Sequence, residues 1–141
     1  MSGGAEAFFF FIFPRELPYT SYIHALPDIR TYLNFGKFVP QTNYKLLKRA
    51  KIYPYSDILS FYKEELLGEC ANYMSILATS SRTPKHVVLK NVADETSAAY
   101  NRAMETLSSN PKALEAYRKF GLGFVAFHTS LPRYKLTELD L

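Results

Sequence analysis

The chain has 141 residues, which suffices for one domain or for a small core with extended arms. Its apolar fraction of 48% is ordinary for a globular protein and argues against a disordered chain, and its 11 Tyr and 11 Phe residues favour interfaces as well as cores. A net charge of +4 permits an acidic protein, an anionic lipid surface or RNA as a partner, and a single cysteine excludes an internal disulfide.

Residues 1–26 form a predicted N-terminal arm. Its prolines interrupt any long helix, which favours a path laid over a surface. The arm contains an apolar run that is far shorter than the roughly 20 residues of a membrane-spanning helix. Exposed apolar patches of this size are rare on soluble monomers, so we expect residues 1–18 to contact a partner subunit or lipid, with few contacts to residues 57–120. The predicted contact residues are Phe8, Phe9, Phe10, Phe11, Ile12 and Phe13.

Residues 29–56 are the most basic part of the chain. They include six Lys or Arg residues and no Asp or Glu, with Tyr and Phe interleaved. Cations beside rings suit RNA phosphates, anionic lipid headgroups or an acidic protein surface, and the plain alternative is a solvated basic face beside a core. The predicted contacts to an anionic surface are Arg30, Lys37, Lys45, Lys48, Arg49 and Lys51.

The predicted helical core covers residues 27–131, and a C-terminal tail follows at residues 132–141. Short helices are expected over residues 27–36 and 43–52. Each of them has a residue suited to a helix start and is followed by a Gly or Pro that suits a helix end.

The strongest helical pattern covers Asp57–Ala78 and predicts the longest helix of the chain. Apolar residues recur there at spacings of three and four. Gly68 costs about 1 kcal/mol of helix propensity, which is too little to end so regular a pattern. Leu66 lies on the apolar stripe, so we expect it to be buried in the core.

Two further helices are predicted after a polar break at residues 79–83. His86–Leu89 is a short run with β-branched residues that suits a strand, although one strand cannot make a sheet. A helix is expected over residues 92–107. Asn110 then suits a helix cap, and it opens a helix that we expect to end at Gly121.

No arrangement of residues predicts a catalytic, cofactor or metal site. His24, His86 and His128 lie far apart and outside any metal-ligand spacing. Cys70 lies on the apolar stripe of a predicted helix, which favours a small buried side chain over a nucleophile. The glycines at 121 and 123 lack the third glycine of a nucleotide-binding loop. We therefore predict no enzyme, no cofactor and no small-molecule substrate.

These elements predict a mainly α protein, a small irregular helical domain with extended N- and C-terminal arms. Small size, basic charge, aromatic arms and missing active-site motifs make it similar in type to supernumerary subunits of mitochondrial respiratory complexes, ATP synthases and mitochondrial ribosomes. The first interpretation is a non-catalytic accessory subunit, peripheral at the mitochondrial inner membrane, that binds neighbouring subunits and lipid. The alternatives are an RNA-binding structural subunit of a mitochondrial ribosome, and a self-assembling coat protein or small enzyme. The modest number of Lys and Arg residues, 17, favours the first over the ribosomal protein.

Overall fold

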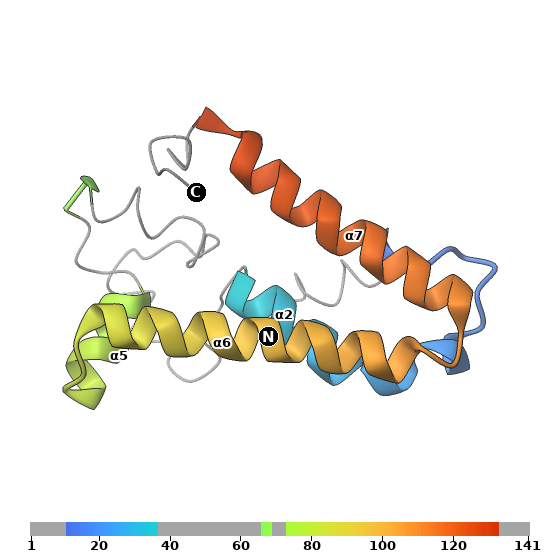
Figure 1. Ribbon diagram of the computed structural model, residues 1–141, viewed down its shortest axis with the longest axis horizontal. Helices are drawn as coiled ribbons and strands as arrows, with labels where there is room; N and C mark the ends of the chain where they lie inside the picture. The colour runs from blue at the N-terminus through green and yellow to red at the C-terminus, as the bar shows by residue number, and fades with distance from the viewer. Residues whose placement is uncertain (1–10, 37–65, 69–72, 133–141) are drawn as a thin grey trace.

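The computed structural model describes residues 11–36, 66–68 and 73–132, and most of these are helical (Figure 1). No strand occurs among them, which confirms the predicted mainly α fold. The described elements are the short 3-10 helices η1 (Tyr19–Ser21) and η2 (Ile23–Ala25) and the α-helices α2 (Leu26–Gly36), α5 (Tyr73–Ser81), α6 (Lys85–Leu107) and α7 (Pro111–Ser130).

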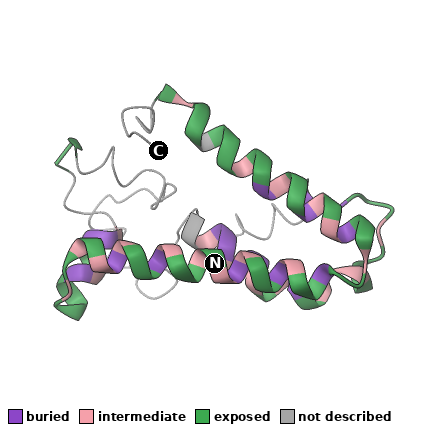
Figure 2. Ribbon diagram, in the orientation of Figure 1, coloured by how far each residue is buried: buried purple, intermediate pink, exposed green. Residues whose placement is uncertain are grey.

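The longest described helix, α6, forms the spine of the fold. α5 lies against its N-terminal part, and α2 lies against its middle and C-terminal part (Figure 1). After a short turn at residues 108–110, α7 runs back beside α6 and then diverges from it (Figure 1). The buried residues of α7 accordingly lie between this turn and the middle of the helix (Figure 2).

The main core lies where α2, α6, the first half of α7 and the N-terminal segment meet. α6 presents Ala99 and Ala103 there, four residues apart on one face, and such small side chains let neighbouring elements approach closely. The buried members of this core are Ile12, Phe13, Ala25, Ile29, Tyr32, Leu33, Ala99, Ala103, Leu107, Ala113 and Tyr117. A second, smaller core joins α5 to α6 and consists of Met74, Ala78, Val88 and Val92.

The start of α7 confirms the predicted cap, but its end does not lie where the sequence suggested. The backbone N–H of Ala113 donates a hydrogen bond to Asn110 Oδ1 at 3.1 Å, and Pro111 occupies the first turn. The expected stop at Gly121 is wrong, because α7 continues to Ser130. A helical glycine costs about 1 kcal/mol, and the apolar residues on either side of it continue the helix.

Three other expectations, for residues 57–89, are also wrong. Gly68 adopts a φ of +68°, a conformation that ends a helix, so Asp57–Ala78 is not one continuous helix. Leu66, which was expected in the core, is 51% exposed. Residues His86–Leu89, which suggested a strand, lie in the first turns of α6 and belong to this long helix. The predicted helix over residues 43–52 lies outside the described residues.

The described part of the N-terminal arm belongs to the main core. The backbone N–H of Leu17 donates to the Pro14 carbonyl at 2.9 Å, and this turn folds the chain back on itself. Ile12 and Phe13 are both buried, and the Phe13 ring stacks on Tyr22 with 4.1 Å between the ring centroids. The expectation of few contacts with the helices was therefore wrong for these residues, because a turn at Pro14 directs part of the apolar run inward.

Candidate functional site

Three tyrosine rings from three helices converge at the centre of the main core, and we name them the tyrosine cluster. Tyr32 comes from α2, Tyr100 from α6 and Tyr117 from α7. The ring centroid of Tyr100 lies 5.2 Å from that of Tyr32 and 5.1 Å from that of Tyr117. The Tyr32 and Tyr117 rings meet edge to face at 6.2 Å. These separations are typical of favourable aromatic pairs, so the cluster holds the three helices together.

Burial keeps the tyrosine cluster in its neutral form. Burial, and then the neighbouring Tyr100, raises the pKa of Tyr32 to about 12. Burial also raises the pKa of Tyr117 strongly, with smaller contributions from the two other rings and from Asp28. The Tyr117 hydroxyl is buried and has no hydrogen-bond partner among the described residues. A buried hydroxyl without a partner is costly, so this atom is a weak point in an otherwise apolar core.

A groove of about 350 Å³ opens beside the tyrosine cluster, where α7 begins to diverge from α6. We name it the interhelical groove. Apart from Tyr100, its lining residues on α6 are polar, those on α7 are glycine and apolar residues, and two rings of the tyrosine cluster also line it. The lining residues are Tyr32, Thr96, Ser97, Tyr100, Asn101, Gly121, Leu122 and Val125.

Gly121 allows the close contact between α7 and the tyrosine cluster. A Cβ atom at this position would lie 2.6 Å from Cε2 and 3.1 Å from the hydroxyl oxygen of Tyr100. The Tyr100 ring cannot retreat easily, because it packs on the Tyr32 and Tyr117 rings. The other glycine of α7, Gly123, would meet nothing within 4 Å.

The two glycines therefore give a matched test of this contact. We expect Gly121→Ala to lower the free energy of unfolding by about 1 kcal/mol, since an overpacking cost of about 1–3 kcal/mol exceeds the helix-propensity gain. Gly123→Ala should raise that free energy by about 0.5–1 kcal/mol, because it gains propensity without a clash. Urea denaturation followed by circular dichroism measures both. Equal gains from the two substitutions would contradict the close approach at Gly121.

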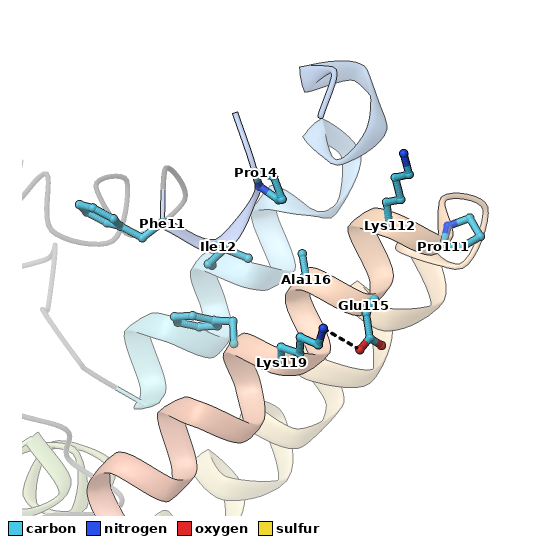
Figure 3. Close-up of a pocket in the computed structure, with 9 residues that line it drawn as sticks. Phe11, Ile12, Pro14, Pro111, Lys112, Glu115, Ala116 and Lys119 are labelled. Atoms are coloured by element: carbon cyan, nitrogen blue, oxygen red, sulfur yellow. Dashed lines mark ion pairs between the residues drawn. The ribbon is translucent and has the colours of Figure 1, made fainter. Parts of the chain in front are cut away.

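A second hollow, of about 780 Å³, lies between the N-terminal segment and the first half of α7 (Figure 3). Phe11, Ile12 and Pro14 border one side of it, and side chains of α7 border the other. Lys119 on α7 forms an ion pair with Glu115 at 3.4 Å along the same helix (Figure 3). One side of the hollow is therefore apolar. The other side is charged, and there the positive charge of Lys119 is paired with the negative charge of Glu115.

The second half of α7 exposes apolar side chains. Leu122 is 63% exposed, Val125 is 46% exposed, and Ala126 is also exposed. We name these three residues the distal face. Val125 and Ala126 follow Leu122 by three and four residues, and this spacing places all three side chains on one side of the helix. No Asp, Glu, Lys or Arg occurs in α7 after Lys119.

Most of the predicted partner-contact residues lie outside the described parts of the chain. They are Phe8, Phe9, Phe10, Lys37, Lys45, Lys48, Arg49 and Lys51. Of the others, Phe11 is 81% exposed beside α7, whereas Ile12 and Phe13 are buried in the core. Arg30 lies on α2 and is half-buried. The structure therefore does not gather the described residues of either predicted surface into one contact site.

Sequence patterns did not predict the tyrosine cluster or the distal face. The distal face depends on the full length of α7, and the glycines in the middle of that helix suggested a stop, whereas the tyrosine cluster joins rings from three helices that lie far apart in the sequence. The available signal was the apolar series Tyr117, Phe120 and Phe124, which continues helical spacing across Gly121. Among the described residues, no group of three or more His, Cys, Asp or Glu side chains could hold a metal ion. None of the helices described is long and apolar enough to cross a membrane.

Comparison with characterised proteins gives similarity to fungal terpene synthases. The chain is 38% identical to alpha-cuprenene synthase COP6 of Coprinopsis cinerea over 139 residues, which cover 99% of this chain and 37% of that protein. It is 35% identical to terpene synthase BipA of Cochliobolus sativus, covering 96% of this chain and 37% of the relative. It is 31% identical to monoterpene synthase 25 of Postia placenta, covering 99% and 36%. The chain thus spans little more than a third of the length of these relatives. No protein-family model and no solved structure matches it.

These similarities overturn the function predicted from the sequence. The relatives are enzymes, so the predictions of a non-catalytic accessory subunit, of no enzyme and of no small-molecule substrate are contradicted. The error arose because small size and missing motifs were interpreted as properties of a complete subunit, whereas the chain matches only part of each relative. The predicted location at the mitochondrial inner membrane is not tested by these similarities and stays a prediction.

Proposed function

We propose that this chain is a piece of a terpene-forming enzyme that acts on an isoprenyl diphosphate. The observation that carries the proposal is the similarity to terpene synthases along almost the whole chain, at 31–38% identity in three fungal proteins. A resemblance limited to a short helical motif would carry no such weight, since amphipathic helices share patterns without sharing function.

The described fold is consistent with a part of a larger helical enzyme. The tyrosine cluster and the small alanines of α6 hold α2, α6 and α7 as one unit. One end of that unit is left with exposed apolar side chains on the distal face. A substrate with a long hydrocarbon chain needs a cavity with predominantly apolar walls, and such cavities form between packed helices. The chain would supply some of these helices, and the remainder of the longer protein would supply the others.

The diphosphate group of such a substrate needs a binding site of its own. Phosphate groups of enzyme substrates are often held together with Mg²⁺, which one or two carboxylates of the protein help to bind. Among the residues that the structure describes, no group of three or more His, Cys, Asp or Glu side chains lies together. The contribution that we propose for the described helices is to the scaffold and the apolar cavity.

A chimeric enzyme tests the proposal. This chain replaces the segment of alpha-cuprenene synthase COP6 that it matches, and the purified chimera is incubated with isoprenyl diphosphates of several chain lengths. We expect hydrocarbon products detectable by gas chromatography and mass spectrometry. The control is the same enzyme with that segment deleted, which should form none. A chimera that shows a cooperative thermal transition and a helical spectrum, yet forms no hydrocarbon from any of these substrates, would contradict the proposed function.

A further inference from the structure

The hollow between the N-terminal segment and α7 runs along one face of the helix. The residues of α7 that line it follow one another at steps of one and three, which places them on a single stripe. This stripe extends from Pro111 to Phe120, a distance of about 14 Å at the rise of an α-helix. The hollow is therefore elongated, and its length suits an extended chain better than a compact ring.

Apolar side chains make up most of the lining (Figure 3). Phe11 on the N-terminal segment is 81% exposed, so its ring can contact a ligand. Ala116 and Phe120 on the α7 side are half-buried and remain accessible from the hollow. The volume of about 780 Å³ lies within the range of about 300–1,000 Å³ found for small-molecule sites. The apolar lining residues are Phe11, Ile12, Pro14, Pro111, Ala116 and Phe120.

The charged side chains of the hollow carry a net charge of +1. Lys112 and Lys119 are positive, and Glu115 is negative. Glu115 pairs with Lys119 at 3.4 Å, whereas Lys112 forms no ion pair with the other residues that the structure describes. One exposed cation is thus left for a ligand with a single negative charge. A diphosphate group carries more negative charge than these side chains can neutralise.

We propose that this hollow binds one long-chain carboxylate, with its hydrocarbon chain along the apolar stripe of α7 and its carboxylate group beside the Lys112 ammonium group. The ammonium group is a compact charge with three hydrogen-bond donors on a flexible stem, so it can follow the carboxylate at the edge of the hollow. An exposed ion pair alone contributes little, and the buried methylene groups therefore supply most of the affinity. The inference goes beyond the proposed function and does not depend on it.

Calorimetric titration of the 141-residue chain with octanoate, decanoate and dodecanoate, below their micellar concentrations, tests the proposal. We expect one ligand per chain and an affinity that rises about twofold to fourfold with each added methylene group. Octanol, which lacks the charge, should bind more weakly than octanoate. Phe11→Ser should lower the affinity for dodecanoate several-fold, because it removes an exposed ring from the lining without disturbing the core.

Charge variants locate the carboxylate. Lys112→Glu should lower the affinity for dodecanoate about fivefold, and Glu115→Gln should raise it about twofold, because it frees Lys119. Arg118→Glu is the matched control. It changes the net charge as much as Lys112→Glu and lies exposed in the same half of α7, but outside the hollow, so the affinity should stay unchanged. All these residues are exposed, and circular dichroism should show the same helix content in each variant.

Four results would overturn the proposal. Equal losses from Lys112→Glu and Arg118→Glu would show an effect of net charge alone. Octanol binding as tightly as octanoate would remove the role of the carboxylate. Farnesyl diphosphate that binds more tightly than dodecanoate, with the same dependence on Lys112, would contradict the charge argument. Failure of all three carboxylates to bind, with binding of an acidic amphipathic peptide instead, would assign the hollow to a protein partner.

Discussion

Replacing Tyr117 with alanine is expected to lower the free energy of unfolding by about 3–5 kcal/mol, as for other large aromatic residues in cores. Tyr117 is fully buried, and its ring contacts both other rings of the tyrosine cluster. Its removal leaves a cavity between α2, α6 and α7 that these helices cannot close without moving. Such a loss is a large part of the 5–15 kcal/mol that typically stabilises a folded protein. Urea denaturation monitored by circular dichroism measures it.

Tyr117→Phe is the matched control, because it keeps the ring and removes only the hydroxyl. That hydroxyl is buried and has no hydrogen-bond partner among the described residues. Its loss should therefore be neutral, or should stabilise the protein by up to about 1–2 kcal/mol. A phenylalanine variant as unstable as the alanine variant would show that the hydroxyl, and not the ring, holds the helices together.

Stability should fall steeply above pH 10. The ordinary pKa of a tyrosine is 10.0, and burial raises that of Tyr32 to about 12. Between these values an unfolded chain loses the proton while the folded chain keeps it, so rising pH favours unfolding. The contribution is fully present below pH 10 and is lost as the pH approaches 12.

Tyrosine substitutions identify the source of this alkaline instability. Denaturant midpoints measured between pH 8 and pH 11.5 should decline for the natural sequence, and the decline should be shallower for Tyr32→Phe. Tyr19→Phe is the control, since Tyr19 is an exposed tyrosine outside the tyrosine cluster. If Tyr19→Phe flattened the decline as much as Tyr32→Phe, the buried cluster would not be its cause.

Local signals in the sequence located several helix boundaries correctly. The proline and glycine around residues 27–36 bracket α2, and Asn110 marks the start of α7 with the cap that the structure shows. These features are local because capping and turn chemistry depend on a few adjacent residues. The wrong predictions of helix ends, at Gly68 and Gly121, share another cause. Gly68 ends a helical segment and Gly121 does not, although both interrupt a similar apolar pattern.

Tertiary contacts distinguish these two glycines. Gly121 lies against the Tyr100 ring, where a larger side chain does not fit. Because the helix continues past Gly121, Phe124 packs on the core. Gly68 has nothing within 4 Å of the position of a Cβ atom. Local sequence patterns could not predict the tyrosine cluster either. Its rings come from positions 32, 100 and 117 and meet only after α7 folds back on α6. The proposed function lay further still from the sequence pattern, since it rests on similarity to longer proteins along almost the whole chain.

The central claim is that this chain works as part of a terpene-forming enzyme, and hydrocarbon formation in trans tests it most directly. Cells produce an isoprenyl diphosphate together with the chain and the part of alpha-cuprenene synthase COP6 that the chain does not match. Volatile products are then measured by gas chromatography and mass spectrometry. Hydrocarbons are expected only when both polypeptides are present. A purified, intact complex of the two polypeptides that yields no hydrocarbon would contradict it.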